Sequence, residues 1–181
     1  MKTIALSTFT RRLTAVALVA VAMATNAFAT DNRAPLVPAE IRVEAGNRVH
    51  FHAYAAGYQV YVATETAGGL KWVLKAPDAV LFDNDGNVVG IHYAGPTWET
   101  ASGSFVKGAR VNGVTVDPSA IPWLLLNATV SGGPGVLNGT TFIQRVNTVG
   151  GLAPASAAGA QIGDELRVAY TAEYYFFRAV K

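Results

Sequence analysis

Short runs of alternating apolar and polar residues, separated by glycine, asparagine, aspartate and proline, dominate this sequence from residue 48 onward. In the first run, Val49 and Phe51 alternate with His50 and His52, which is the period-two pattern of a half-buried β-strand. Further strands are predicted at residues 58–64, 71–74, 80–83, 88–93, 104–111, 114–116, 123–130, 141–147 and 166–177. Helical periodicity is nearly absent, so the chain must bury its apolar faces by packing strands.

This pattern predicts an all-β, single-domain fold of about nine to eleven short antiparallel strands. A single open sheet of that size would leave one apolar face in water, which favours a β-sandwich or a closed β-barrel. Two hairpins are expected, at residues 84–87 and at Asn112-Gly113, because Asp-Gly and Asn-Gly suit turns with positive φ. Residues 67–69 are expected to join a third pair of strands, and residues 152–163 to form a loop.

Residues 1–29 have the features of a cleavable signal peptide. Lys2, Arg11 and Arg12 form a basic segment, and residues 13–24 form an uncharged apolar run. Small residues at Ala27 and Ala29 predict cleavage before Thr30. The apolar run is shorter than the ~20 residues that a membrane-spanning helix needs, although an uncleaved anchor stays open as an alternative. We therefore expect a secreted or periplasmic protein with an extended lead-in at 30–47 and one β domain at 48–181.

Charge and cysteine content narrow the possible functions. The leader carries three of the 14 basic residues and none of the 12 acidic ones, so the exported chain has a net charge near −1. No basic cluster remains to bind phosphates, which argues against a nucleic-acid partner. The absence of cysteine excludes a disulfide, a thiolate metal site and a cysteine nucleophile. No phosphate loop, dinucleotide motif or serine-hydrolase motif is present, and we expect no cofactor.

Several sequence strings occur together in an order typical of one family. They are Gly57-Tyr58-Gln59-Val60-Tyr61, Ala76-Pro77-Asp78-Ala79, His92-Tyr93-Ala94-Gly95-Pro96-Thr97-Trp98-Glu99, Pro122-Trp123-Leu124-Leu125, Ile143-Gln144-Arg145-Val146-Asn147-Thr148 and Tyr170-Thr171-Ala172-Glu173-Tyr174. With these strings the chain resembles the secreted domain-of-unknown-function family 3455 (DUF3455) over about residues 35–178. The resemblance implies export and a β-rich fold, and it implies no established activity.

The chain departs from that family in one respect. Relatives often have cysteines at the positions of Ala63 and of one residue within 157–160, and both are missing here. The resemblance therefore implies that these two places are neighbours in space, and that this member has lost a bridge between them.

The segment from His92 to Ser104 contains the first candidate site. A histidine with a pKa near 6.5 and a carboxylate can form an acid–base pair, so His92 and Glu99 are the catalytic candidates if Gly95-Pro96 turns the chain. In a ligand-binding interpretation, the residues involved are His92, Tyr93, Trp98, Glu99 and Ser104. The alternative is structural: a fixed corner with Trp98 in the core and polar side chains bonded to the loop backbone.

Two further groups of polar residues are weaker candidates. His50 and His52 lie two residues apart on one predicted strand, and with His92 they can supply three nitrogen ligands to zinc or copper. A surface strand with a polar face is the alternative. Arg145 beside Gln144, with Glu173, is expected to form a buried or half-buried structural network, because an arginine on an apolar strand needs a partner.

The sequence favours a non-catalytic exported module, monomeric or weakly oligomeric, that binds a small molecule, a glycan or an envelope partner near residues 92–104. Exposed tyrosine and tryptophan on a sheet of low charge suit such ligands. Two alternatives stay open: an enzyme that uses His92 and Glu99, and a purely structural envelope protein.

Overall fold

The computed structural model describes residues 33–180, and the predicted signal peptide lies outside them. A short 3-10 helix, η1 (Ala39–Ile41), precedes eight strands. The strands are β1 (Asn47–Thr66), β2 (Gly69–Phe82), β3 (Val88–Tyr93), β4 (Thr97–Thr100), β5 (Phe105–Val114), β6 (Trp123–Gly132), β7 (Phe142–Gly150) and β8 (Glu165–Ala179). None of the helices formed by residues 33–180 is long and apolar enough to span a membrane.

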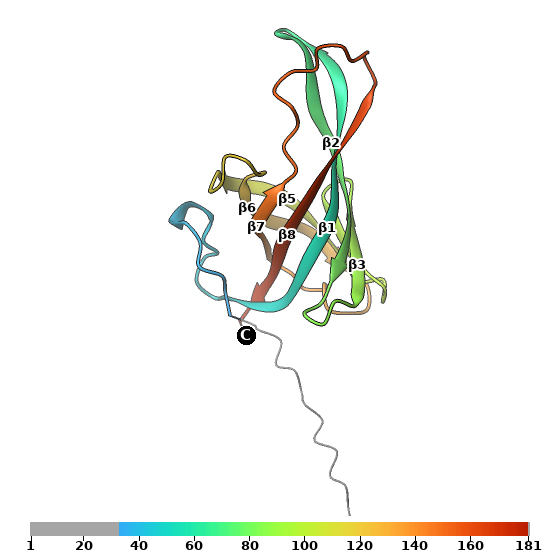
Figure 1. Cartoon of the computed structure of the whole chain (residues 1–181). Helices are drawn as coiled ribbons and strands as arrows, with labels where there is room; N and C mark the ends of the chain where they lie inside the picture. Colours follow the sequence, from blue (N-terminus) through green and yellow to red (C-terminus); the bar gives the residue numbers. More distant parts are fainter. Residues whose placement is uncertain (1–32, 181) are drawn as a thin grey trace, which may run out of the picture.

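The eight strands form one antiparallel sheet that closes into a ring (Figure 1). Each strand pairs with the next along the chain, and β8 returns to pair with β1 from Asn47↔Ala179 to Val62↔Glu165. The all-β prediction is confirmed. The sandwich alternative is wrong, because the strands belong to a single sheet. Closure leaves no unpaired edge along most of β1 and β8.

The predicted strand count was too high because several runs belong to one long strand. Runs 48–53 and 58–64 are both parts of the 20-residue β1, which stays continuous through Gly57. A Cβ at Gly57 would lie 2.2 Å from the backbone oxygen of Asp78, so glycine permits a close approach of β1 and β2 there. The strands are therefore fewer and longer than the turn residues suggested.

The predicted hairpin at residues 84–87 is confirmed between β2 and β3. The Asp83 carboxylate accepts hydrogen bonds from the backbone N–H groups of Asp85 and Asn87, and Gly86 has a φ of 81°. The hairpin predicted at Asn112-Gly113 is wrong, because β5 continues through both residues and pairs with Leu125 and Leu124. A register shift between Arg110 and Asn112 absorbs the irregularity instead.

The lead-in packs against the outside of the ring. Ile41 is fully buried, and its backbone oxygen accepts a hydrogen bond of 2.6 Å from the Gln144 side chain on β7. The Glu40 backbone oxygen accepts one from Asn112 Nδ2 on β5. These bonds attach residues 39–41 to two strands, so the lead-in covers an outer face that would otherwise be exposed.

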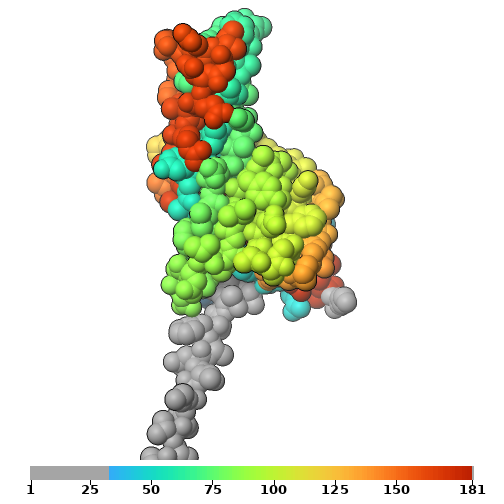
Figure 2. Space-filling model, turned by 90° about the vertical axis from the view of Figure 1, so that its right-hand side faces the viewer, coloured from blue at the N-terminus to red at the C-terminus, as the bar shows by residue number. Residues whose placement is uncertain are grey.

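The ends of β1 and β2 and the loop at 151–164 project beyond the ring as a narrow extension (Figures 1 and 2). Ala63 N–H donates to the Asp164 backbone oxygen, and Gly163 N–H donates to the Ala63 oxygen. Ala63 and Ala157 are both buried. The expected proximity of Ala63 to 157–160 stays a prediction, and these bonds support it by joining Ala63 to the residues that follow that stretch.

Candidate functional site

The ring encloses a cavity of about 390 Å³. Its lining is mostly apolar and comes from every strand except β4 and from residues between strands: Gln59, Tyr61, Leu74, Pro77, His92, Pro96, Gly108, Ala109, Arg110, Ile121, Pro122, Leu124, Leu126, Arg145, Leu152 and Tyr174. The cavity opens toward solvent where exposed residues contribute to the wall, among them Leu74, Arg110 and Leu152. Its volume lies in the range of small-molecule sites, roughly 300–1,000 Å³.

Strand alternation determines which side chains enter the cavity. Arg145 on β7 is opposite Leu124 on β6 and Tyr174 on β8, and all three line the cavity. Their sequence neighbours point the other way, as the bond from Gln144 to the lead-in shows. Inward positions of paired strands thus form part of the cavity wall, and residues between strands complete it.

Gln59 supplies a buried polar group to the cavity wall. Its side chain is only 2% exposed and lines the cavity, and its Nε2 makes no hydrogen bond within residues 33–180. Burial raises the pKa of the Tyr170 phenol, and the nearby Gln59 amide acts in the opposite direction. The geometry between Gln59 Nε2 and the Tyr170 hydroxyl is nevertheless not that of a hydrogen bond. A buried amide donor without a partner costs roughly 1–3 kcal/mol, so such a group in a cavity wall indicates a place where a ligand acceptor can bind.

Arg145 brings a positive charge to the same wall. Its Nε and Nη2 donate to the Pro122 backbone oxygen at 3.2 and 2.8 Å, and its charge opposes the burial that raises the pKa of the nearby Tyr174 phenol. Within the described part of the chain no carboxylate forms an ion pair with it. The guanidinium has five N–H donors, so these contacts orient it without using all of them.

His92 is buried and neutral. Burial, and secondarily the charge of Arg145, lower its pKa to about 3, against an opposite effect of the hydrogen bond to Thr97. Nδ1 donates to the Thr97 backbone oxygen at 2.9 Å, which leaves Nε2 as an acceptor. The ring also stacks on Trp98 with centroids 4.2 Å apart. Nε2 of the neutral His92 ring is therefore a fixed hydrogen-bond acceptor in the cavity wall. The ring becomes a protonated acid only when the pH falls to about 3.

Three tyrosines complete the polar interior. The Tyr61 hydroxyl donates to the Gly151 backbone oxygen, and the hydroxyls of Tyr170 and Tyr174 lie 3.4 Å apart. Burial raises the pKa of each phenol. All three therefore stay protonated and can act as neutral hydrogen-bonding groups.

The residues predicted for the 92–104 site do not form one site. His92 and Trp98 face the interior, where Trp98 is fully buried. Tyr93 and Glu99 face outward, and the Tyr93 hydroxyl donates to Glu99 Oε2 at 2.7 Å. The proposed acid–base pair is not formed, because His92 and Glu99 lie on opposite faces of the β3–β4 ladder, in which His92 is opposite Trp98 and Ile91 opposite Glu99.

Ser104 has a structural position. It is fully buried, its Oγ lies 2.7 Å from Thr100 Oγ1, and it accepts a hydrogen bond from the backbone N–H of Leu137. It is not among the residues that line the cavity. Of the five predicted ligand-binding residues, only His92 contributes to the cavity wall.

The three histidines considered for metal binding are also separate. His50 lies 3.1 Å from Thr140 Oγ1 and accepts from Arg178, and His92 is inside the ring. Burial and the charges of Arg178 and Arg48 lower the pKa of His50 to about 4. No group of three or more histidine, cysteine or acidic residues among residues 33–180 is placed to hold a metal ion.

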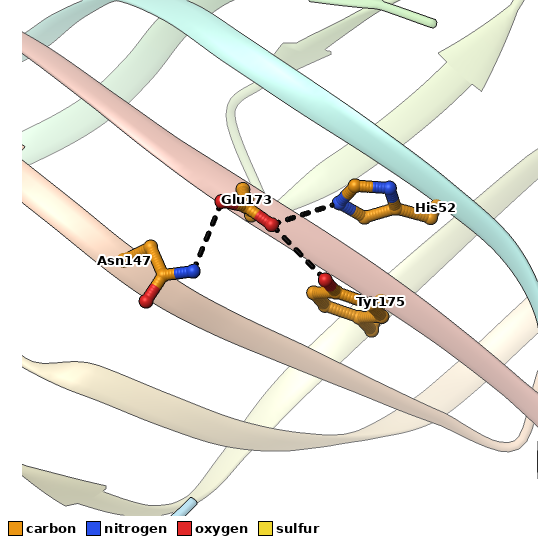
Figure 3. Close-up of polar contacts among 4 residues, drawn as sticks. All are labelled: His52, Asn147, Glu173 and Tyr175. Carbon is orange, nitrogen blue, oxygen red and sulfur yellow. Dashed lines mark hydrogen bonds and ion pairs between the residues drawn. The ribbon is translucent and has the colours of Figure 1, made fainter. Parts of the chain in front are cut away.

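The third histidine belongs to a polar cluster on the outer face of the ring (Figure 3). The Glu173 carboxylate accepts hydrogen bonds from His52 at 3.0 Å, Tyr175 at 3.0 Å and Asn147 at 2.9 Å. His52 also stacks on Tyr175. The cluster ties β1, β7 and β8 together. The predicted network of Arg145, Gln144 and Glu173 is wrong, because Arg145 faces inward while Gln144 and Glu173 face outward.

Sequence reasoning singled out Arg145 and His92 but missed Gln59 and Tyr174 as parts of the wall. Alternation gives a partial signal, since Gln59 and Tyr61 are two residues apart and share a face, as do Tyr170 and Tyr174. It cannot tell which face becomes the inside of the ring when both faces carry aromatic and polar residues.

The fold and the cavity define the class as an all-β protein with one antiparallel sheet closed around an internal, mostly apolar site. The chain belongs to the family described as "Protein of unknown function (DUF3455)", whose model matches residues 44–178, and this confirms the resemblance seen in the sequence. Searches of curated proteins and of solved structures gave no match.

Proposed function

We propose that this protein is exported and binds a small, largely apolar molecule inside its ring, without catalysing a reaction. The carrying observation is the cavity of about 390 Å³, whose apolar wall holds a few fixed polar groups, one of them Gln59 Nε2, which has no hydrogen-bond partner among residues 33–180. Concave and mostly apolar sites with few polar groups are typical of small-molecule binding. Export rests on the predicted leader at 1–29.

The chemistry of the wall supports binding over catalysis. Among the described residues that line the cavity there is no aspartate, glutamate, serine, threonine, cysteine or lysine. His92 has a pKa far below neutrality, and the buried tyrosines have raised pKa values. General acid–base catalysis favours a group that titrates near the working pH, and none of these groups does. The apolar wall also favours a small apolar molecule over a glycan.

A neutral apolar fluorophore, N-phenyl-1-naphthylamine, tests the proposal without reference to charge. We expect saturable fluorescence enhancement with the purified protein at one site per chain. Leu124→Trp, which places a bulky ring in the wall, should weaken binding at least tenfold. Asn127→Trp, three residues further along β6 at an exposed position, is the matched control and should bind as the unchanged protein does.

If a folded Leu124→Trp variant binds the fluorophore with unchanged affinity, the cavity is not the site. Ala109→Trp, at an exposed position of the wall, provides the same test should Leu124→Trp not fold. Near-ultraviolet circular dichroism establishes folding for each variant.

A further inference from the structure

We infer that the ligand carries a carboxylate, and that Arg145 holds this group inside the ring. The inference rests on the proposed function and names the chemical class of the molecule bound. Its basis is an imbalance: the polar groups of the cavity include positive charge and hydrogen-bond donors, and no acidic side chain among residues 33–180 lines the cavity.

The charges at the cavity have one sign. Among the described residues the wall contains two arginines, Arg110 and Arg145, and no acidic side chain. Two exposed cations outside the cavity do have acidic partners: Arg167 pairs with Asp78, and Lys75 with Glu165. A half-buried guanidinium without a carboxylate is costly, because the cation loses hydration and gains no opposite charge. An anionic ligand supplies that charge.

The charge of Arg145 shifts the pKa values of three neighbouring groups. Arg145 contributes to lowering the pKa of His92 and works against the burial that raises those of Tyr61 and Tyr174. No carboxylate contributes to the pKa of any of these three groups. Arg145 is thus the charge that dominates the interior.

The donors are held ready for an acceptor. Two N–H groups of Arg145 bind the Pro122 oxygen, which fixes the guanidinium on β7 and leaves further N–H groups for another acceptor. Gln59 Nε2, on β1, adds a second buried donor in the same wall with no partner among residues 33–180. A carboxylate has two oxygens with about four acceptor sites, so it has the capacity to accept hydrogen bonds from more than one donor residue of the wall.

Charge magnitude favours a carboxylate over a phosphate. The Arg145 guanidinium is half-buried in the wall, and Arg110 is exposed at the opening. A phosphate monoester carries roughly −1.5 to −2 at neutral pH, which one half-buried cation does not balance, whereas a carboxylate carries a single charge. The remaining wall, with residues such as Leu124, Leu126 and Ile121, is suited to a hydrocarbon body.

Competition against N-phenyl-1-naphthylamine with three ligands of equal chain length tests the inference. The ligands are decanoate, 1-decanol and decylamine, at pH 7.5. We expect decanoate to displace the fluorophore at a concentration at least tenfold below that of 1-decanol, and decylamine to bind weakest. Arg145→Gln should reduce decanoate affinity at least tenfold and leave 1-decanol unchanged. Arg167→Gln, an exposed arginine outside the cavity, is the control and should change neither.

Equal displacement by decanoate and 1-decanol would overturn the carboxylate inference and leave the binding function intact. Failure of the fluorophore to bind at all would overturn the binding function itself. If Arg145→Gln does not fold, Gln59→Leu provides a second test. Removal of the Nε2 donor should reduce the affinity for decanoate about three- to tenfold and leave the affinity for 1-decanol unchanged. An unchanged preference in a folded Gln59→Leu variant, together with an unchanged preference in Arg145→Met, which removes the charge, would contradict the assignment.

Discussion

Consecutive residues of β8 belong to two polar regions on opposite faces of the same sheet. Tyr174 points into the ring beside Arg145, while Glu173 and Tyr175 point out toward His52. On the outer face the hydrogen bonds of the cluster join its own residues, and the Glu173 carboxylate accepts three of them (Figure 3). On the inner face Gln59 Nε2 has no partner, and Arg145 has no carboxylate in the described part of the chain.

The difference separates a structural role from a binding role. A network whose donors and acceptors satisfy one another stabilises the folded state and has little left to offer a ligand. Unsatisfied donors in a cavity wall lower the stability of the folded protein while the cavity is empty. A ligand with complementary acceptors removes this cost when it binds. A histidine–carboxylate contact therefore does not by itself mark the functional site in this protein.

Loss of the Glu173 carboxylate should have the largest effect on stability. Glu173→Ala leaves the buried His52 and the Tyr175 hydroxyl without their acceptor, and the side chain of Glu173 is only 21% exposed. We expect a loss of about 3 kcal/mol in the free energy of unfolding, because unsatisfied buried groups cost roughly 1–3 kcal/mol each. Urea denaturation measures it. A loss below about 0.5 kcal/mol, as for an ordinary surface substitution, would show that the outer cluster is not structural.

Acid should weaken the fold through the buried histidines. His92 titrates at about 3 in the folded protein and near 6.5 when unfolded, so between these values the unfolded chain binds a proton that the folded chain excludes. This contribution is fully present above pH 6.5 and is lost as the pH falls toward 3. One such group costs about 1.4 kcal/mol per pH unit, or about 2 kcal/mol by pH 5.

His50, with a pKa lowered to about 4, acts in the same direction. Denaturant unfolding at pH 7 and pH 5 measures the loss, and His92→Phe, which can keep the stacking on Trp98, should reduce it. If the variant and the unchanged protein lose the same free energy between these two pH values, His92 is not the source.

Gln59→Leu should leave stability within about 1 kcal/mol of the unchanged protein, or raise it, since the Nε2 group makes no hydrogen bond within residues 33–180 that could be lost. A leucine of similar size also removes an unsatisfied donor from an apolar wall. Thermal unfolding measures the change in the absence of ligand. A loss above about 2 kcal/mol, the cost of leaving buried partners unsatisfied, would mean that this amide is structural, and the contrast between the two faces would fail.

The smallest effect is expected at the exposed pair formed by Tyr93 and Glu99. Tyr93→Phe removes one surface hydrogen bond to Glu99, so the change in unfolding free energy should stay below about 0.5 kcal/mol. Urea denaturation beside Glu173→Ala makes the comparison direct. A cost above about 1.5 kcal/mol, the upper end for an ordinary hydrogen bond, would place this pair with the outer cluster as a structural element.

Local signals predicted the parts of the fold that depend on local geometry. The Asp83–Asn87 turn forms because one carboxylate caps two backbone N–H groups within the turn itself. Asn112-Gly113 carries a similar signal, yet β5 passes through it because pairing with Leu124 and Leu125 outweighs the turn preference. The four-residue β4 was missed because its position depends on neighbouring strands rather than on its own alternation.

The candidate site was harder to predict than the strands. His92 and Glu99 are close in sequence, but the β3–β4 ladder places their side chains on opposite faces. Gln59, Arg145 and Tyr174 are far apart in sequence and meet at the cavity only because β1, β7 and β8 become neighbours when the sheet closes.

The sequence by itself determined the all-β class, the family, the β2–β3 hairpin and the alternation that assigns side chains to two faces. These features depend on period, turn residues and composition, which are properties of short segments. Only the tertiary structure decided that one sheet closes on itself, which face becomes the interior, and that an arginine and an unpartnered amide share one cavity. Those outcomes depend on the register and pairing of strands that are distant in the chain, such as β1 and β8, and no short segment encodes them.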